Sequence, residues 1–60
     1  MNAKDREFYK AEEIAELLQV NIMTIYRYIK SGKLRAHKIG KEYRIERAEF
    51  KRFLDATKTT

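Results

Sequence analysis

The chain has 60 residues, of which 43% are hydrophobic and 38% charged, and its formal net charge is +5. This length allows a single domain with a small core, and the apolar fraction is too high for a disordered chain. The absence of cysteine excludes disulfides and thiolate metal sites. One histidine, His37, cannot form a metal site without partners, so we expect neither a metal nor a cofactor. No apolar run approaches the roughly 18 residues of a membrane-spanning helix, and a signal-peptide core is missing, so we expect a cytoplasmic protein.

The positive charge is concentrated in the middle of the sequence. Residues 1–20 carry three basic and five acidic groups, net −2, whereas residues 21–45 carry seven basic groups and one acidic group, net +6. Residues 46–60 have a net charge of +1. A positive field focused in this way suits a polyanion such as nucleic acid, although a solvated basic surface without a ligand is an alternative.

The first predicted helix spans residues 11–18. Its apolar residues at i, i+3 and i+4 form one face of a helix: Ile14, Leu17 and Leu18. Lys10 precedes this helix as its N-cap, and a residue that cannot accept a hydrogen bond there costs about 0.5–2 kcal/mol. Just before it, Phe8 and Tyr9 indicate either a very short strand or a hydrophobic staple.

The second predicted helix runs from about Asn21 to Ser31. Asn21 is a good N-cap, and Gly32 fits the left-handed position that ends many helices. The inward face of this helix consists of Ile25, Tyr28 and Ile29. The opposite face consists of Met23, Tyr26, Arg27 and Lys30. The helix therefore has one side for packing and one for a ligand.

Beyond Gly32 the apolar period changes from that of a helix to that of a strand. With Gly40 and Lys41 at the tip of a hairpin, Ala36 faces Ile45 and Lys38 faces Tyr43. The other face then holds Arg35, His37 and Arg44 as a basic side.

A last helix is predicted over residues 47–56, with Phe50, Phe53 and Leu54 on its apolar face. We expect tails at residues 1–7 and 57–60, and one domain over residues 8–56.

This order predicts an α+β fold, a small winged helix-turn-helix with three helices and a two-stranded hairpin wing between the second and third. In such a fold the second helix enters the major groove of DNA and the wing contacts phosphates or the minor groove. We therefore predict binding of double-stranded DNA. The predicted contact residues are Asn21, Met23, Thr24, Tyr26, Arg27, Lys30, Lys33, Arg35, Lys38, Lys41 and Arg44.

Four stretches in this order resemble the MerR-like winged helix-turn-helix domains of the excisionase type. They are AEEIAELL at 11–18, TIYRYIKSGKL at 24–34, KIGKEYRI at 38–45 and RAEFKRFL at 47–54. The resemblance covers residues 8–54. It implies a DNA-binding excision factor or small transcription regulator, located with the nucleoid, or the DNA-binding part of a larger protein. It also implies a basic contact at Arg27.

Three departures from that family bear on stability or mechanism. Lys10 stands where the first helix of the family often has Ser or Thr as its cap. Gln19 stands in the turn where the family often has glycine, and a left-handed residue with a side chain costs about 1 kcal/mol. Ile22 and Met23 stand where polar base-contacting residues are common. These two side chains can contact thymine methyl groups but cannot form hydrogen bonds with a base. The sequence therefore favours phosphate contacts and DNA shape over direct base recognition.

Other classes of function have less support. A protein-interaction module would use Ile22, Met23 and Tyr26 as a hydrophobic anchor. An RNA-binding module would need a pair of solvent-facing aromatic residues on a sheet, which the pattern does not supply. Catalytic motifs are missing. Glu12 and Glu13 are neighbours on a helix, so they point about 100° apart and fit a helix-dipole role instead.

A domain this small specifies only a short site, so we expect two or more copies on repeated half-sites. Symmetric half-sites would be about 10–10.5 base pairs apart or a multiple of that. Direct repeats are the alternative. No small-molecule ligand and no membrane contact are expected.

Overall fold

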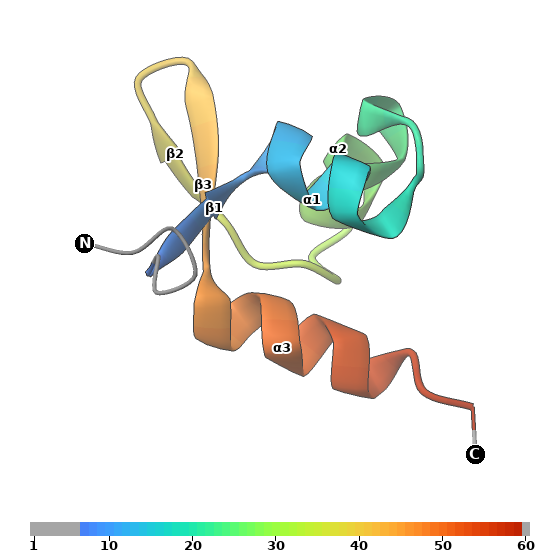
Figure 1. Ribbon diagram of the computed structural model, residues 1–60. Coiled ribbons are helices and arrows are strands. Elements are labelled where there is room, and N and C mark those ends of the chain that lie inside the picture. Colours follow the sequence, from blue (N-terminus) through green and yellow to red (C-terminus); the bar gives the residue numbers. More distant parts are fainter. Residues whose placement is uncertain (1–6, 60) are drawn as a thin grey trace.

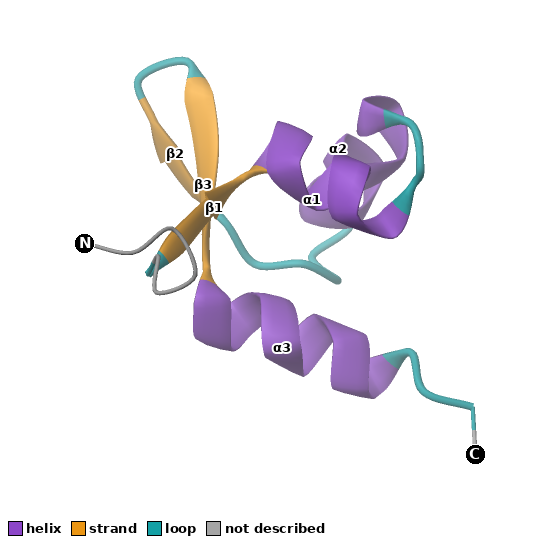
Figure 2. Ribbon diagram, in the orientation of Figure 1, coloured by secondary structure: helices purple, strands orange, loops and turns teal. Residues whose placement is uncertain are grey.

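The computed structural model describes residues 7–59; the predicted tail residues 1–6 and 60 lie outside the described part. Six elements follow one another along the chain (Figures 1 and 2). They are β1 (Phe8–Lys10), α1 (Ala11–Leu18), α2 (Ile22–Lys30), β2 (His37–Ile39), β3 (Glu42–Glu46) and α3 (Arg47–Ala56). The predicted bounds of all three helices are confirmed to within one residue at each end.

The α1 helix begins and ends as its sequence predicts. Lys10 is the N-cap, and its backbone N–H donates to the Glu13 carboxylate at 2.8 Å. Gln19 ends the helix in the left-handed conformation with φ 56°, which confirms the expected backbone strain. The Val20 N–H then donates to the Ala15 carbonyl at 3.0 Å, and this bond closes the tight turn into α2.

One residue of α1 lies elsewhere than predicted. Leu17 was expected on the packing face, but it is 59% exposed. The buried face instead combines Ile14 with two alanines, Ala11 and Ala15. Close approach of the neighbouring elements to these small side chains turns the helix so that Leu17 faces away from the core.

The α2 helix is capped at both ends. The Asn21 side chain accepts a hydrogen bond from the Met23 N–H at 2.8 Å, as expected for this N-cap residue. Gly32 has φ 84°, and the Tyr28 carbonyl accepts from the N–H groups of Lys33 and Leu34 at 3.0 and 3.1 Å. Helices α1 and α2 thus form a compact pair joined by a short turn.

The sheet has three antiparallel strands in the order β1-β3-β2. The prediction of a two-stranded hairpin was therefore incomplete, because β1 pairs along the free edge of β3, with Tyr9 opposite Ile45. The structure confirms one of the two predicted pairs of the hairpin, with Lys38 opposite Tyr43. Ala36 precedes β2 and takes no part in the ladder. The wing, defined as β2, β3 and the turn between them, projects away from α3 (Figure 1).

The core lies where the helix pair, the sheet and α3 meet. Its fully buried side chains come from α1, α2, the segment before β2, and β3: Ile14, Ile25, Leu34 and Ile45. From α3, Phe50 packs its ring edge-on against Tyr9, with centroids 5.4 Å apart, and Phe53 lies 5.1 Å from the Tyr28 ring. Burial of Phe50 confirms its predicted core position.

These elements confirm the predicted α+β winged helix-turn-helix class, with one more strand than expected. Within residues 7–59, no helix is long and apolar enough to cross a membrane.

Candidate nucleic-acid interface

The outer face of α2 presents the side chains that its sequence pattern predicts. Met23, Tyr26, Arg27 and Lys30 are all exposed, and Met23 is 58% exposed. Among the residues that the structure describes, neither Arg27 nor Lys30 forms an ion pair. The outer face of α2 therefore combines two free cations with one apolar and one aromatic side chain.

The first turn of α2 has limited polar capacity. The Asn21 side-chain oxygen is occupied by the Met23 N–H, which leaves its amide NH₂ as a donor. Thr24 is half-buried, and its N–H donates to the Asn21 carbonyl at 2.9 Å. Ile22 packs against the core, so the exposed large apolar side chains near this end are Met23 and, in the turn before the helix, Val20. The anchor proposed for a protein-interaction module is correspondingly smaller than three residues.

The wing contacts α2 through aromatic rings. The ring centroids of Tyr26 and Tyr43 lie 5.8 Å apart, and the Lys38 ammonium lies 5.6 Å from the Tyr43 centroid. Tyr43, predicted only as the residue opposite Lys38 in the hairpin, is half-buried and joins the two predicted DNA-binding elements. We call this the Tyr26–Tyr43 contact. It gives α2 and the wing one continuous surface, with Lys41 exposed at the wing tip.

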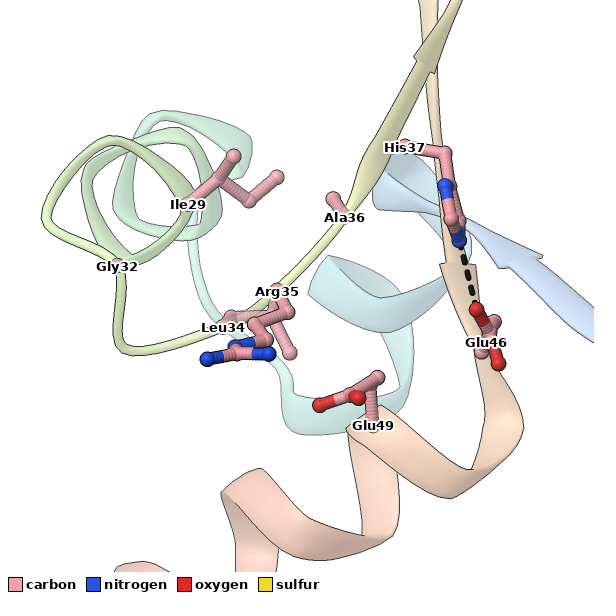
Figure 3. Close-up of a pocket in the computed structure, with 8 residues that line it drawn as sticks. All are labelled: Ile29, Gly32, Leu34, Arg35, Ala36, His37, Glu46 and Glu49. Atoms are coloured by element: carbon pink, nitrogen blue, oxygen red, sulfur yellow. Dashed lines mark hydrogen bonds and ion pairs between the residues drawn. The ribbon is translucent and has the colours of Figure 1, made fainter.

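The other face of the wing differs from its prediction. Arg44 lies opposite His37 in the ladder, and its guanidinium lies 3.0 Å from the Glu42 carboxylate. His37 in turn lies 2.6 Å from the Glu46 carboxylate (Figure 3). The expected basic side is thus partly neutralised by two glutamates. Strand alternation places Glu42, Arg44 and Glu46 on one face. The presence of two glutamates on the basic side of the wing could therefore have been predicted from the sequence.

Lys33 and Arg35 follow α2 in the segment that leads to β2. Both line a hollow of about 250 Å³ beside α3, together with Glu49 and Arg52. This segment passes between the helix pair and α3, away from the wing tip (Figure 1). The structure therefore separates these two predicted contacts from Lys38 and Lys41, and it adds Arg52, which the sequence analysis did not single out.

Residues 7–59 contain no group of three or more His, Cys, Asp or Glu side chains that could hold a metal ion. The candidate site consists of cationic and aromatic side chains.

Comparison with known proteins gives one family and one relative. A family model described as "Helix-turn-helix domain" matches residues 8–58. The chain is 38% identical over 45 residues to the "Uncharacterized protein YvgK" of Bacillus subtilis (strain 168), which corresponds to 75% of this chain. The aligned part makes up 15% of the length of YvgK. No solved structure matches the chain.

Proposed function

The chain belongs to the helix-turn-helix domain family, and from this premise we propose that it binds double-stranded DNA through α2 and the wing. The observation that supports this most is the Tyr26–Tyr43 contact. It joins two elements that carry exposed cations into one surface. The cations of this surface are Arg27, Lys30, Lys38 and Lys41.

In the proposed complex α2 lies in the major groove. Asn21, Met23 and Thr24 lie in its first turn, the part of a recognition helix that contacts base edges. Met23 suits the methyl group of thymine, whereas Asn21 retains amide donors for a base or phosphate. Arg27, Lys30 and the hydroxyl of Tyr26 then contact phosphates, which fix the position of the helix without reading sequence.

The wing extends this footprint along the duplex. Lys38 and Lys41 contact phosphates or the minor groove beside the one that α2 occupies. Arg44 lies on the other face of the sheet and pairs with Glu42, so we give it a minor share. Lys33 and Arg35 line the hollow beside α3, and we assign them outside the main DNA contact.

The biological role that we propose rests on the resemblance to the excisionase type. The protein acts as an excision factor or small transcription regulator, in the cytoplasm with the nucleoid, by occupying or bending DNA. Two or more copies bind side by side on repeated half-sites, because one short helix and a wing specify few base pairs. Residues 8–56 form the DNA-binding domain in this proposal.

Selection from a random duplex library tests the proposal. We expect enrichment of short, repeated sites, and a single-stranded RNA competitor should displace the duplex only in at least about tenfold excess. Failure to bind any duplex at low salt would refute DNA binding. In that case the exposed Met23 and Tyr26 would favour a protein partner instead.

A further inference from the structure

A basic groove lies between α3 and the segment that follows α2, apart from the proposed DNA-binding surface. We define the linker–α3 groove by Lys33, Arg35, Glu49, Arg52 and Phe53, which line its hollow of about 250 Å³. A second hollow of about 420 Å³ adjoins it, because both are lined by Arg35 and Glu49. The wider hollow has an apolar floor that includes Ile29 and Leu34 (Figure 3).

The charged side chains of this groove are unpaired within the described part of the chain. Among residues 7–59, the side chains of Lys33, Arg35 and Arg52 form no ion pair. Arg35 and Glu49 line the same hollow, yet no ion pair joins them (Figure 3). Three cations against one carboxylate give the groove a net charge of +2. Such a groove suits an acidic segment that also carries an apolar side chain.

The outer face of α1 has this chemistry. Every exposed residue of α1 is either acidic or leucine: Glu12, Glu16 and Leu17. We call these three the α1 patch. Glu12 and Glu16 stand at i and i+4, so they lie next to each other on the helix surface, and neither forms an ion pair among the described residues. Leu17 is 59% exposed and lies about 100° further round the helix from Glu16, so it borders the acidic pair on one side.

We propose that the α1 patch of one copy docks into the linker–α3 groove of a second copy. Glu12 and Glu16 pair with Arg35 and Arg52, and Leu17 covers the apolar lining of the groove. Charge complementarity selects this occupant, because the same chain supplies both a free acidic surface and a free basic groove. A protein of net charge +5 otherwise repels its own copies.

The position of the groove separates this contact from DNA binding. The groove lies beside α3, whereas the wing tip projects away from α3 (Figure 1). A duplex held by α2 and the wing tip therefore leaves the groove open. Patch and groove are different surfaces, so the contact is heterologous and successive copies keep the same orientation. This inference rests on the proposed function in one respect, which is the expectation that several copies bind to one duplex.

Concentration-dependent ¹⁵N NMR spectra of the 60-residue chain, without DNA and at low salt, test the contact. Between about 0.05 and 1 mM, a range suited to weak interfaces, we expect shifts confined to the α1 patch and the groove. Arg52→Glu should weaken self-association at least about tenfold. Its matched control is Lys51→Glu, which makes the same charge change at an exposed α3 position that does not line the hollow. This control should retain the shifts.

A charge swap makes the test specific to these two surfaces. Glu16→Lys alone should abolish the shifts, whereas Glu7→Lys, at an exposed residue outside both surfaces, should not. Mixing the Glu16→Lys and Arg52→Glu chains should restore association, because the unmodified patch of the Arg52→Glu chain fits the unmodified groove of the Glu16→Lys chain, and the two reversed surfaces also carry opposite charges. Both positions are exposed, and the spectra report directly whether each variant is folded.

Three results of the measurements without DNA would overturn the proposal. They are a lack of concentration-dependent shifts up to about 1 mM, shifts located at other surfaces such as Met23 or Ile39, and a mixture that fails to restore association. A duplex added to the same sample provides a separate measurement. If it shifts Arg52 and Lys33 as strongly as α2, the groove binds phosphate and the copy–copy contact is wrong. If it shifts nothing while self-association persists, the proposed DNA binding fails and the contact stands.

Discussion

Arg27 and Lys51 are both exposed cations, but they lie on different surfaces. Arg27 belongs to the outer face of α2, whereas Lys51 lies on α3. We predict that Arg27→Ala weakens duplex binding by about 1–2 kcal/mol and lowers the salt-dependence slope by about one, as loss of one phosphate contact should. Lys51→Ala removes the same charge and should change affinity less than about twofold. Fluorescence anisotropy with one labelled duplex measures both. Equal losses would show that net charge, and not the α2 surface, governs binding.

Lys10 is a residue where the fold is less stable than it could be. Its N–H bonds to Glu13, which is one half of a capping box, but a lysine side chain cannot accept the reciprocal bond. Lys10→Thr supplies a hydroxyl acceptor and a residue suited to strand β1. We predict a gain of about 1 kcal/mol, which for a chain of this size raises the Tm by roughly 4–8 °C. Calorimetry measures the Tm, and an unchanged value would contradict the expected hydroxyl cap.

At the scale of elements, the wing and α2 act together only if their relative position is fixed. The Tyr26–Tyr43 contact is the observed link between them, and a ring pair of this kind contributes about 0.5–1.5 kcal/mol beyond its buried area. Tyr43→Val keeps a strand-forming residue but removes the ring, whereas Tyr43→Phe keeps the ring. We predict that the valine variant loses the energetic coupling between Arg27→Ala and Lys41→Ala in a double-mutant cycle on duplex affinity. The phenylalanine variant should retain it. A coupling that is the same in both variants would assign the link to another contact.

Local patterns determined the elements but not all of their partners. The bounds of α1, α2 and α3 follow from caps and apolar spacing, which are properties of neighbouring residues. Apolar spacing does not determine how α1 is rotated about its own axis, because Ile14 and Leu18 can form an apolar face with either Leu17 or Ala15. Only the approach of other elements selects Ala15. Pairing of β1 with β3 joins residues more than thirty positions apart, and three residues are too few to show a strand period.

The candidate site was predictable to a similar degree. The outer face of α2 follows from helix geometry, and the structure places Met23, Tyr26, Arg27 and Lys30 there. The contact of Tyr26 with Tyr43 depends on how the wing packs on α2, which no local pattern specifies. Strand alternation grouped Arg35 with the wing, and Lys33 was grouped there by its charge and its place just after the helix. Their separation arises because the chain passes beside α3 before it enters β2.

At the scale of the whole molecule, charge is distributed over three surfaces. The surface of α2 and the wing is basic, the outer face of α1 is acidic, and the linker–α3 groove is basic. A net charge of +5 alone would attract any polyanion weakly. The arrangement predicts instead that DNA is held on one side while the acidic face of α1 points away from it. Orientation of the protein on DNA therefore follows from its charge distribution.

The salt dependence of duplex binding tests the central claim most directly. Four exposed cations, Arg27, Lys30, Lys38 and Lys41, form the proposed contact surface. If each neutralises one phosphate, a plot of log K against log salt concentration has a slope of about −3.6. We predict a slope within about one unit of this value for an otherwise unmodified duplex. A slope near zero, or no binding to duplex at low salt, would contradict DNA binding by this surface.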